Sequence, residues 1–253
     1  MGGVEAAPRL SDRRLFVPAD RLAGPRLTLT GAPHQHLARV LRARVGDRIT
    51  VFDGAGGELD AQVVRVGRAE TEIELGGRQI AAAPAVAITL LCAVPRGPRM
   101  DLLVQKTCEL GVARLVPVIA DRSLVRPVAE ASRRARWERI AQEASRQSGR
   151  ADVPIIDAPL PLAAALESST LPARRLALVE RTRDRSLRAE LAGKEPAATA
   201  LLVGPEGGFA TGEVEATRRA GFLGVSLGSR ILRVETAAIV GVALVAAASG
   251  MLD

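Results

Sequence analysis

The chain has 253 residues, with 35 basic and 28 acidic side chains and a formal net charge of +7. An apolar fraction of 47% and a charged fraction of 25% exclude a globally disordered chain and predict one or two globular domains. The charge is concentrated, because residues 96–150 carry 12 basic and 6 acidic side chains while the rest is close to neutral. This concentration favours a polyanionic partner, although a solvent-exposed arginine-rich helix would carry the same charge.

Cysteine, histidine and hydropathy patterns exclude several other classes. Cys92 and Cys108 lack metal-ligand spacing and lie in apolar surroundings, which predicts buried thiols of a cytosolic protein. His34 and His36 have no cysteine nearby, so a zinc site is not expected. The N-terminus has no signal-peptide pattern, and the uncharged stretch 236–252 is short for a membrane span. We therefore expect a cytoplasmic protein without a metal or a membrane segment.

The first third of the chain has the pattern of a small β domain. Residues 1–12 are polar and expected to be flexible. Residues 13–82 contain short apolar runs separated by Gly, Asp and Pro, a spacing typical of a small barrel or sandwich. Strands are expected at 27–29, 48–52, 59–66 and 71–75.

One helix is expected to interrupt these strands, over residues 34–44. Its side chains Leu37, Val40 and Leu41 share one face at helical spacing, and Gly46 follows as a stop signal. Arg39 and Arg42 are displaced from this face, so the pattern predicts an amphipathic helix.

The pattern changes at the small-residue stretch 81–84, which is the expected domain boundary. Beyond it, uninterrupted apolar runs alternate with amphipathic segments, as buried parallel strands alternate with helices. Strands are expected at 86–94, 115–119, 177–179, 200–203 and 224–227, and helices at 100–110, 133–150, 213–220 and 236–248. Residues 83–253 are therefore predicted to form an α/β domain with a mostly parallel sheet.

The sharpest local feature is the segment LVGPEGGF at residues 202–209. A buried strand runs into a glycine-rich turn here, and glycines at a strand end let a ligand approach backbone groups. The segment lacks the Gly-Lys-Ser/Thr of a phosphate loop, and Glu206 disfavours an anionic group. A neutral or cationic ligand fits best, although a tight strand-to-helix turn without a ligand has the same pattern.

A second segment, LGSRILRVETA at residues 227–237, also starts at a strand end and enters a helix. Glu235 and Thr236 fall at the start of that helix, where an acidic side chain favours the helix dipole. A capping role is therefore the alternative to a chemical one. Two such turns at strand ends of one sheet favour a single shared ligand pocket.

Together the two segments resemble the C-terminal motifs of the ribosomal RNA small subunit methyltransferase E family, of the SPOUT class. The resemblance covers nearly the whole chain in the family's order. It includes RLF at 14–16, HLARVLR at 36–42 with Gly46-Asp47, Phe52-Asp53-Gly54, Lys106 through Gly111, and Trp137 through Arg150. One position departs, since Arg146-Gln147 stands where the family usually has Glu-Gln, and this puts in doubt a role for an acid there.

The resemblance implies an S-adenosylmethionine-dependent enzyme that methylates N3 of a uridine in 16S ribosomal RNA of the small subunit. It implies a PUA-like, RNA-binding β-barrel at 13–82 and an α/β domain at 83–253 whose last part forms a deep trefoil knot. It also implies a homodimer with the knots at the interface. Two alternatives stay open: a SPOUT enzyme that methylates a ribose 2'-hydroxyl, and a non-catalytic RNA-binding assembly factor.

The resemblance also assigns roles to individual residues. Those expected to bind the cofactor are Leu202, Gly204, Pro205, Glu206, Gly207, Gly208, Leu227, Gly228, Ile231, Leu232 and Thr236. Arg233 is expected to stabilise negative charge on the uracil oxygens, and Glu235 or Glu206 to accept the N3 proton. Contacts to RNA are expected from Arg14, Arg39, Arg42, Arg99, Lys106 and Arg150.

Overall fold

The computed structural model describes residues 13–123, 130–179 and 185–252, so the flexible segment expected at 1–12 lies outside the described residues. The chain forms two compact units. Residues up to Ala83 together with Gln142–Val153 form the N-terminal unit, and Pro84–Ala141 with Pro154–Asp253 form the C-terminal unit. The division inferred from the sequence assigned 142–153 to the second domain, whereas the structure groups this segment with the first.

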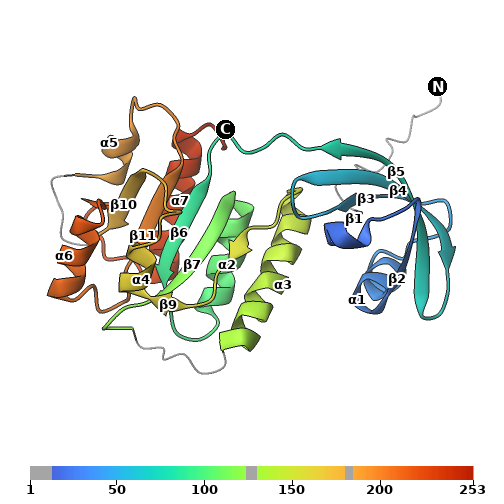
Figure 1. Ribbon diagram of the computed structural model, residues 1–253, viewed down its shortest axis with the longest axis horizontal. Coiled ribbons are helices and arrows are strands. Elements are labelled where there is room, and N and C mark those ends of the chain that lie inside the picture. The colour runs from blue at the N-terminus through green and yellow to red at the C-terminus, as the bar shows by residue number, and fades with distance from the viewer. Residues whose placement is uncertain (1–12, 124–129, 180–184, 253) are drawn as a thin grey trace. The chain divides into compact units, whose positions relative to one another are not determined.

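The N-terminal unit is built on a five-stranded sheet (Figure 1). In spatial order its strands are β1 (Arg14–Phe16), β3 (Arg48–Phe52), β4 (Gly57–Val66), β5 (Glu70–Ile80) and β2 (Arg26–Thr30). β1 pairs with β3 in parallel, and the other neighbours are antiparallel. Leu59, Ala61 and Val63 of β4 are buried and alternate with more exposed polar residues, because successive side chains point to opposite faces. The four strands expected in this part are confirmed.

The helix expected at 34–44 is wrong in both bounds. A short helix, α1 (Gly31–Gln35), begins earlier and passes directly into a π-helical turn, η3 (His36–Val40). The hydrogen bonds of a π-helix span five residues, so the angular spacing differs from that of an α-helix. As a result Leu37 is fully buried, whereas Val40 is 67% exposed and does not share the buried face.

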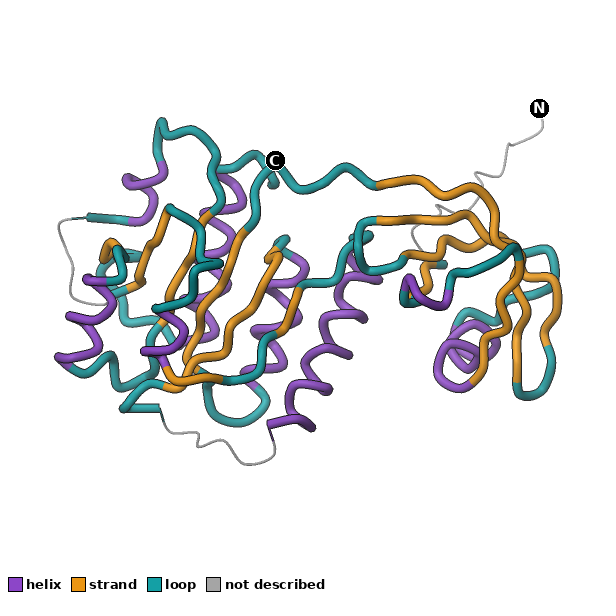
Figure 2. Tube along the Cα trace, in the orientation of Figure 1, coloured by secondary structure: helices purple, strands orange, loops and turns teal. Residues whose placement is uncertain are grey.

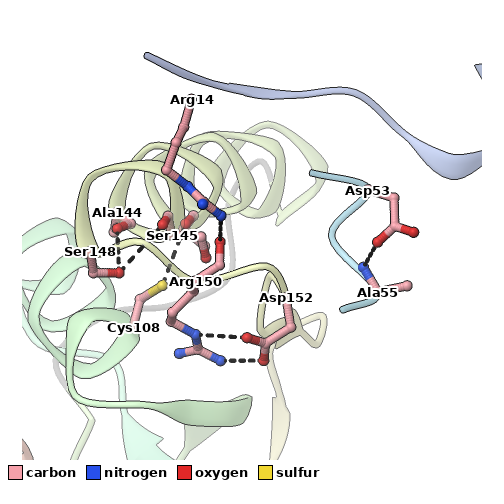
Figure 3. Close-up of polar contacts among 10 residues, drawn as sticks. Arg14, Asp53, Ala55, Cys108, Ala144, Ser145, Ser148, Arg150 and Asp152 are labelled. Carbon is pink, nitrogen blue, oxygen red and sulfur yellow. Dashed lines mark hydrogen bonds and ion pairs between the residues drawn. The ribbon is translucent and has the colours of Figure 1, made fainter. Parts of the chain in front are cut away.

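Residues 142–153 join the N-terminal unit through backbone contacts. Val153 N–H donates to the Gly54 carbonyl (2.9 Å) in the loop after β3. Arg14 Nη2 donates to the Arg150 carbonyl (2.9 Å), and Figure 3 shows this contact. The segment is therefore hydrogen-bonded to the first strand and to the loop that follows the third.

The C-terminal unit contains a seven-stranded sheet in which every pairing is parallel. Its strands are β12 (Leu223–Val225), β10 (Arg174–Leu178), β11 (Thr199–Val203), β6 (Ile88–Ala93), β7 (Val112–Ile119) and β8 (Ile155–Ile156) in spatial order, with β9 (Leu160–Pro161) also paired to β7. All five expected strands are present, and the mostly parallel α/β domain is confirmed. The short strands β8 and β9 were not expected.

Helices cover both faces of this sheet (Figures 1 and 2). They are α2 (Arg99–Glu109), α3 (Glu130–Ser148), α4 (Leu162–Leu166), α5 (Leu187–Leu191), α6 (Thr211–Arg219) and α7 (Val234–Ala248). α2 and α7 pack on one face, and α4 and α6 on the other. α7 approaches the strands closely at Gly241, where a Cβ would lie 2.8 Å from the Leu201 side chain. In the described part of the chain, no helix is long and apolar enough to cross a membrane.

Candidate cofactor site

The first glycine-rich segment lies at the carboxyl end of β11, in the interior of the parallel sheet. β11 is buried throughout and pairs with β10 and β6. Beyond it, Gly208 has a φ of +68°, and its N–H donates to the Pro205 carbonyl (2.8 Å). At Gly204, a Cβ would lie 2.9 Å from the ring of Phe209. Glycine is therefore required at 208 for the backbone angle and at 204 for close contact with the ring.

The second segment lies at the carboxyl end of β12, which pairs with β10. Gly228 has a φ of +112°, and a Cβ there would meet no atom within 4 Å. The backbone angle thus requires glycine, while the space beside it is open. The carboxyl ends of β10, β11 and β12 share one edge of the sheet because these strands are parallel neighbours.

A cavity of about 750 Å³ lies at this edge and is lined by both segments. The expected cofactor residues that line it are Gly204, Pro205, Glu206, Gly207, Gly208, Leu227, Gly228 and Leu232. Three others do not line it. Leu202 is buried within β11, whereas Ile231 is 78% exposed and Thr236 is also exposed. The structure therefore brings most of the two segments together around one space.

The sequence reasoning missed several lining residues. Leu178 is the last residue of β10 and Val179 follows it at the same edge. The expected strand at 177–179 could have indicated both residues. Four arginines also line the cavity, and they come from separate segments that no local pattern connects. They are Arg122, Arg185, Arg218 and Arg230.

Arg99, at the start of α2, pairs with one carboxylate from each segment. Its Nη1 lies 3.4 Å from Glu206 Oε1, and its Nε lies 3.7 Å from Glu235 Oε1. Glu235 is only 7% exposed, and its Oε2 is buried without a hydrogen-bond partner among the described residues. Arg99 was expected to contact RNA, and in the structure its guanidinium group pairs with two acidic side chains of the site.

The charges of the two carboxylates act on Cys92, and Glu235 lies at the start of α7. Burial, and then the negative charges of Glu206 and Glu235, raise the pKa of the Cys92 thiol, which stays protonated. Arg233 is exposed at the N-cap of α7 and makes no side-chain capping hydrogen bond. Glu235 lies in the first turn of α7, where the helix dipole also favours its charge. The charged form of Glu235 is therefore favoured both by the dipole of α7 and by the ion pair with Arg99.

The other residues expected to contact RNA differ in how exposed their side chains are and in whether they form ion pairs within the protein. Arg39 and Arg42 are exposed on the N-terminal unit, and Arg42 has a φ of +49°. Arg14 is 7% exposed and pairs with an acidic side chain. Lys106 and Arg150 also form ion pairs, at 2.9 Å and 2.5 Å. Among the described residues, no group of three or more His, Cys, Asp or Glu side chains could hold a metal ion.

Two family models match the chain. The model described as an RNA methyltransferase domain matches residues 82–246, and the model described as an RNA methyltransferase PUA domain matches residues 34–75. The α/β unit with its cavity is therefore of the RNA methyltransferase class.

Individual relatives narrow this class. Ribosomal RNA small subunit methyltransferase E of Synechocystis sp. is 35% identical over 233 residues, covering 91% of this chain and 76% of the relative. The enzyme of the same name from Mycobacterium tuberculosis is 29% identical over 226 residues, covering 86% and 85%. The chain belongs to the ribosomal RNA small subunit methyltransferase E family, as its motifs predicted.

Solved structures agree with this family. Ribosomal RNA small subunit methyltransferase E from Neisseria gonorrhoeae, bound to S-adenosyl methionine, matches with a TM-score of 0.82 and 32% identity over 93% of this chain and 97% of that chain. A putative methyltransferase from Legionella pneumophila, in complex with the cofactor SAM, matches with a TM-score of 0.82 and 31% identity over the same shares of 93% and 97%.

Proposed function

We propose that this protein transfers a methyl group from S-adenosylmethionine to N3 of a uridine in 16S ribosomal RNA of the small subunit. The observation that carries the proposal is the cavity lined by both glycine-containing segments, in a chain of the ribosomal RNA small subunit methyltransferase E family. The structures of the relatives from Neisseria gonorrhoeae and Legionella pneumophila hold the cofactor.

The cavity fits this cofactor in size and chemistry. Its volume of about 750 Å³ lies within the range of about 300–1,000 Å³ typical of small-molecule and cofactor pockets. Gly228 leaves open space beside its backbone, and Leu227 and Leu232 offer apolar surface for the adenine. The carboxylate of Glu206 suits a cationic group. When bound, S-adenosylmethionine supplies an electrophilic methyl group on a sulfonium.

The residues of this chain would position the uridine and remove the proton from N3. Glu235 is the proposed proton acceptor, because its Oε2 is buried without a hydrogen-bond partner among the described residues. Arg99 holds the other oxygen of this carboxylate. Arg233 lies between the cavity-lining residues Leu232 and Val234, and it is the proposed donor to the uracil oxygens as negative charge develops.

The family also supports proposals about architecture and partners. The PUA-domain match at 34–75 supports RNA binding by a β-barrel at 13–82. For the methyltransferase domain at 83–253, we propose a deep trefoil knot in its last part and a homodimer with the knots at the interface. We also propose a cytoplasmic location, which the proposed ribosomal RNA substrate supports.

Nucleoside mass spectrometry of small-subunit RNA from cells with and without the gene tests the proposal. We expect one N3-methyluridine to disappear without the gene, and purified protein with S-adenosylmethionine to restore it. Loss of a 2'-O-methylated nucleotide instead would indicate a ribose acceptor. An unchanged set of nucleosides, together with no cofactor binding by calorimetry, would indicate a non-catalytic assembly factor.

A further inference from the structure

The lining of the cavity carries far more positive than negative charge. Arg122, Arg185, Arg218 and Arg230 line it, whereas Glu206 is the single acidic residue in the described lining. All four arginines are exposed. Glu206 also forms an ion pair with Arg99 (3.4 Å).

This charge does not suit the cofactor alone. S-adenosylmethionine has one carboxylate against a sulfonium and an ammonium group, so its net charge is positive. One arginine could pair with that carboxylate, but the remaining arginines would repel the cofactor unless another anion were present. The cavity therefore has the electrostatics of a site that holds a cation and a polyanion side by side.

The arginines reach the cavity from four separate segments of the C-terminal unit. Arg122 follows β7, and its Nη1 donates to the Gly207 carbonyl (3.0 Å), which attaches it to the glycine-rich turn. Arg218 lies in the last turn of α6, and Arg230 lies in the loop before α7. In the described part of the chain, neither Arg218 nor Arg230 forms an ion pair or a side-chain hydrogen bond. Their guanidinium groups are thus available to a ligand.

We propose that these four arginines bind the phosphates of RNA on either side of the target nucleotide, at the mouth of the cofactor cavity. The inference rests on the proposed function and names the part of the site that holds the RNA. Guanidinium groups match phosphate oxygens in charge and geometry, and each phosphate contact releases counterions. The surface is distinct from the basic residues expected to contact RNA from the sequence.

Arg218 and Arg219 provide a matched pair for the test. Both are exposed in the last turn of α6, so the helix dipole favours both equally, but only Arg218 lines the cavity. Binding of small-subunit ribosomal RNA and of whole small subunits is measured for Arg218→Ala, Arg219→Ala and Arg230→Ala over a series of salt concentrations. Calorimetry with S-adenosylmethionine on the same variants reports the cofactor site, and thermal unfolding reports stability.

We expect Arg218→Ala and Arg230→Ala to weaken RNA binding about tenfold, the loss of one hydrogen bond to a charged group. The slope of log affinity against log salt should fall by about 0.7 for each variant, while cofactor affinity is unchanged. Arg219→Ala should change RNA affinity less than about twofold, since it removes the same charge away from the cavity. Equal effects of Arg218→Ala and Arg219→Ala would overturn the proposal.

Three other outcomes are distinguishable. Weaker cofactor binding with unchanged RNA binding would mean that an arginine holds the carboxylate of S-adenosylmethionine, which also overturns the inference. A wild-type protein that binds neither ribosomal RNA nor small subunits would refute the proposed function itself. If the wild-type protein methylates the RNA and all three variants keep both this activity and full RNA affinity, the inference about the arginines is refuted and the proposed function is not.

Discussion

Replacing Arg99 by methionine removes the cation that two carboxylates of the cofactor site share. Arg99 Nε lies 3.7 Å from Glu235 Oε1. At that separation, the Coulomb energy is about 1 kcal/mol in water and about 4.5 kcal/mol at the effective dielectric near a protein surface. The Arg99 side chain is 38% exposed and that of Glu235 is 10% exposed. Solvent screening of Arg99 therefore brings the expected coupling to about 2 kcal/mol.

A double-mutant cycle in urea denaturation measures this coupling. We expect Arg99→Met to lower the free energy of unfolding by about 2 kcal/mol, since it leaves Glu235 buried without a counter-charge. In a Glu235→Gln background, the same substitution should cost less than about 0.5 kcal/mol. The protein concentration is held constant throughout, because any association of subunits would contribute to the measured stability.

The pair Arg136 and Asp101 on the same unit serves as a control. Their closest atoms are 2.5 Å apart, but the Arg136 side chain is 63% exposed. We expect their coupling to stay below about 1 kcal/mol, as for other surface ion pairs. Additive effects of Arg99→Met and Glu235→Gln, within about 0.3 kcal/mol, would refute the view that Arg99 holds this carboxylate.

Three further predictions concern the cavity and the N-terminal unit. Gly228→Ala should weaken S-adenosylmethionine binding about tenfold through backbone strain of about 1–2 kcal/mol. Gly193 is also at positive φ and in open space, and neither it nor its chain neighbours line the cavity. Gly193→Ala should therefore destabilise the protein to a similar extent and leave the calorimetric affinity unchanged. Arg233→Ala should abolish methyl transfer with cofactor affinity retained, and a fully active variant would exclude Arg233 from the reaction. Burial, followed by the charge of Arg146, lowers the pKa of His36 from 6.5, so unfolded His36 binds the proton more readily and stability should fall as pH drops below about 6.5. Urea midpoints at pH 7.5 and 5.5 should differ less in His36→Gln, and an equal difference would assign the acid sensitivity to other groups.

The sequence predicted the C-terminal sheet well because its strands are buried on both faces. β6 and β11 are uncharged and apolar apart from Thr89 and Thr199, a pattern typical of strands in a covered parallel sheet. Short elements such as α4 and α5, of five residues each, carry too few periods to be recognised. The helix at 34–44 failed for a different reason, since a π-helical turn changes the period on which the prediction depended.

The candidate site could be predicted only where the backbone imposes residue types. Gly204 and Gly208 are required by local geometry, and local geometry leaves a mark in the sequence. Side chains that pair only in the folded protein leave no such mark in the sequence. Arg99 and Glu206, for example, are 107 positions apart. The four arginines around the cavity come from separate segments of a chain that is rich in arginine throughout, so the sequence does not indicate which of them lie close together.

Helix α3 begins in one compact unit and ends in the other, with the change between Ala141 and Gln142. A fragment that stops at Ala83 would leave the loop after β3 without its hydrogen-bond partner at Val153. A single cut in the chain after Ala83 therefore does not separate the two units. A recombination event or a truncation at the apparent linker, residues 81–84, would therefore divide the N-terminal unit rather than release it.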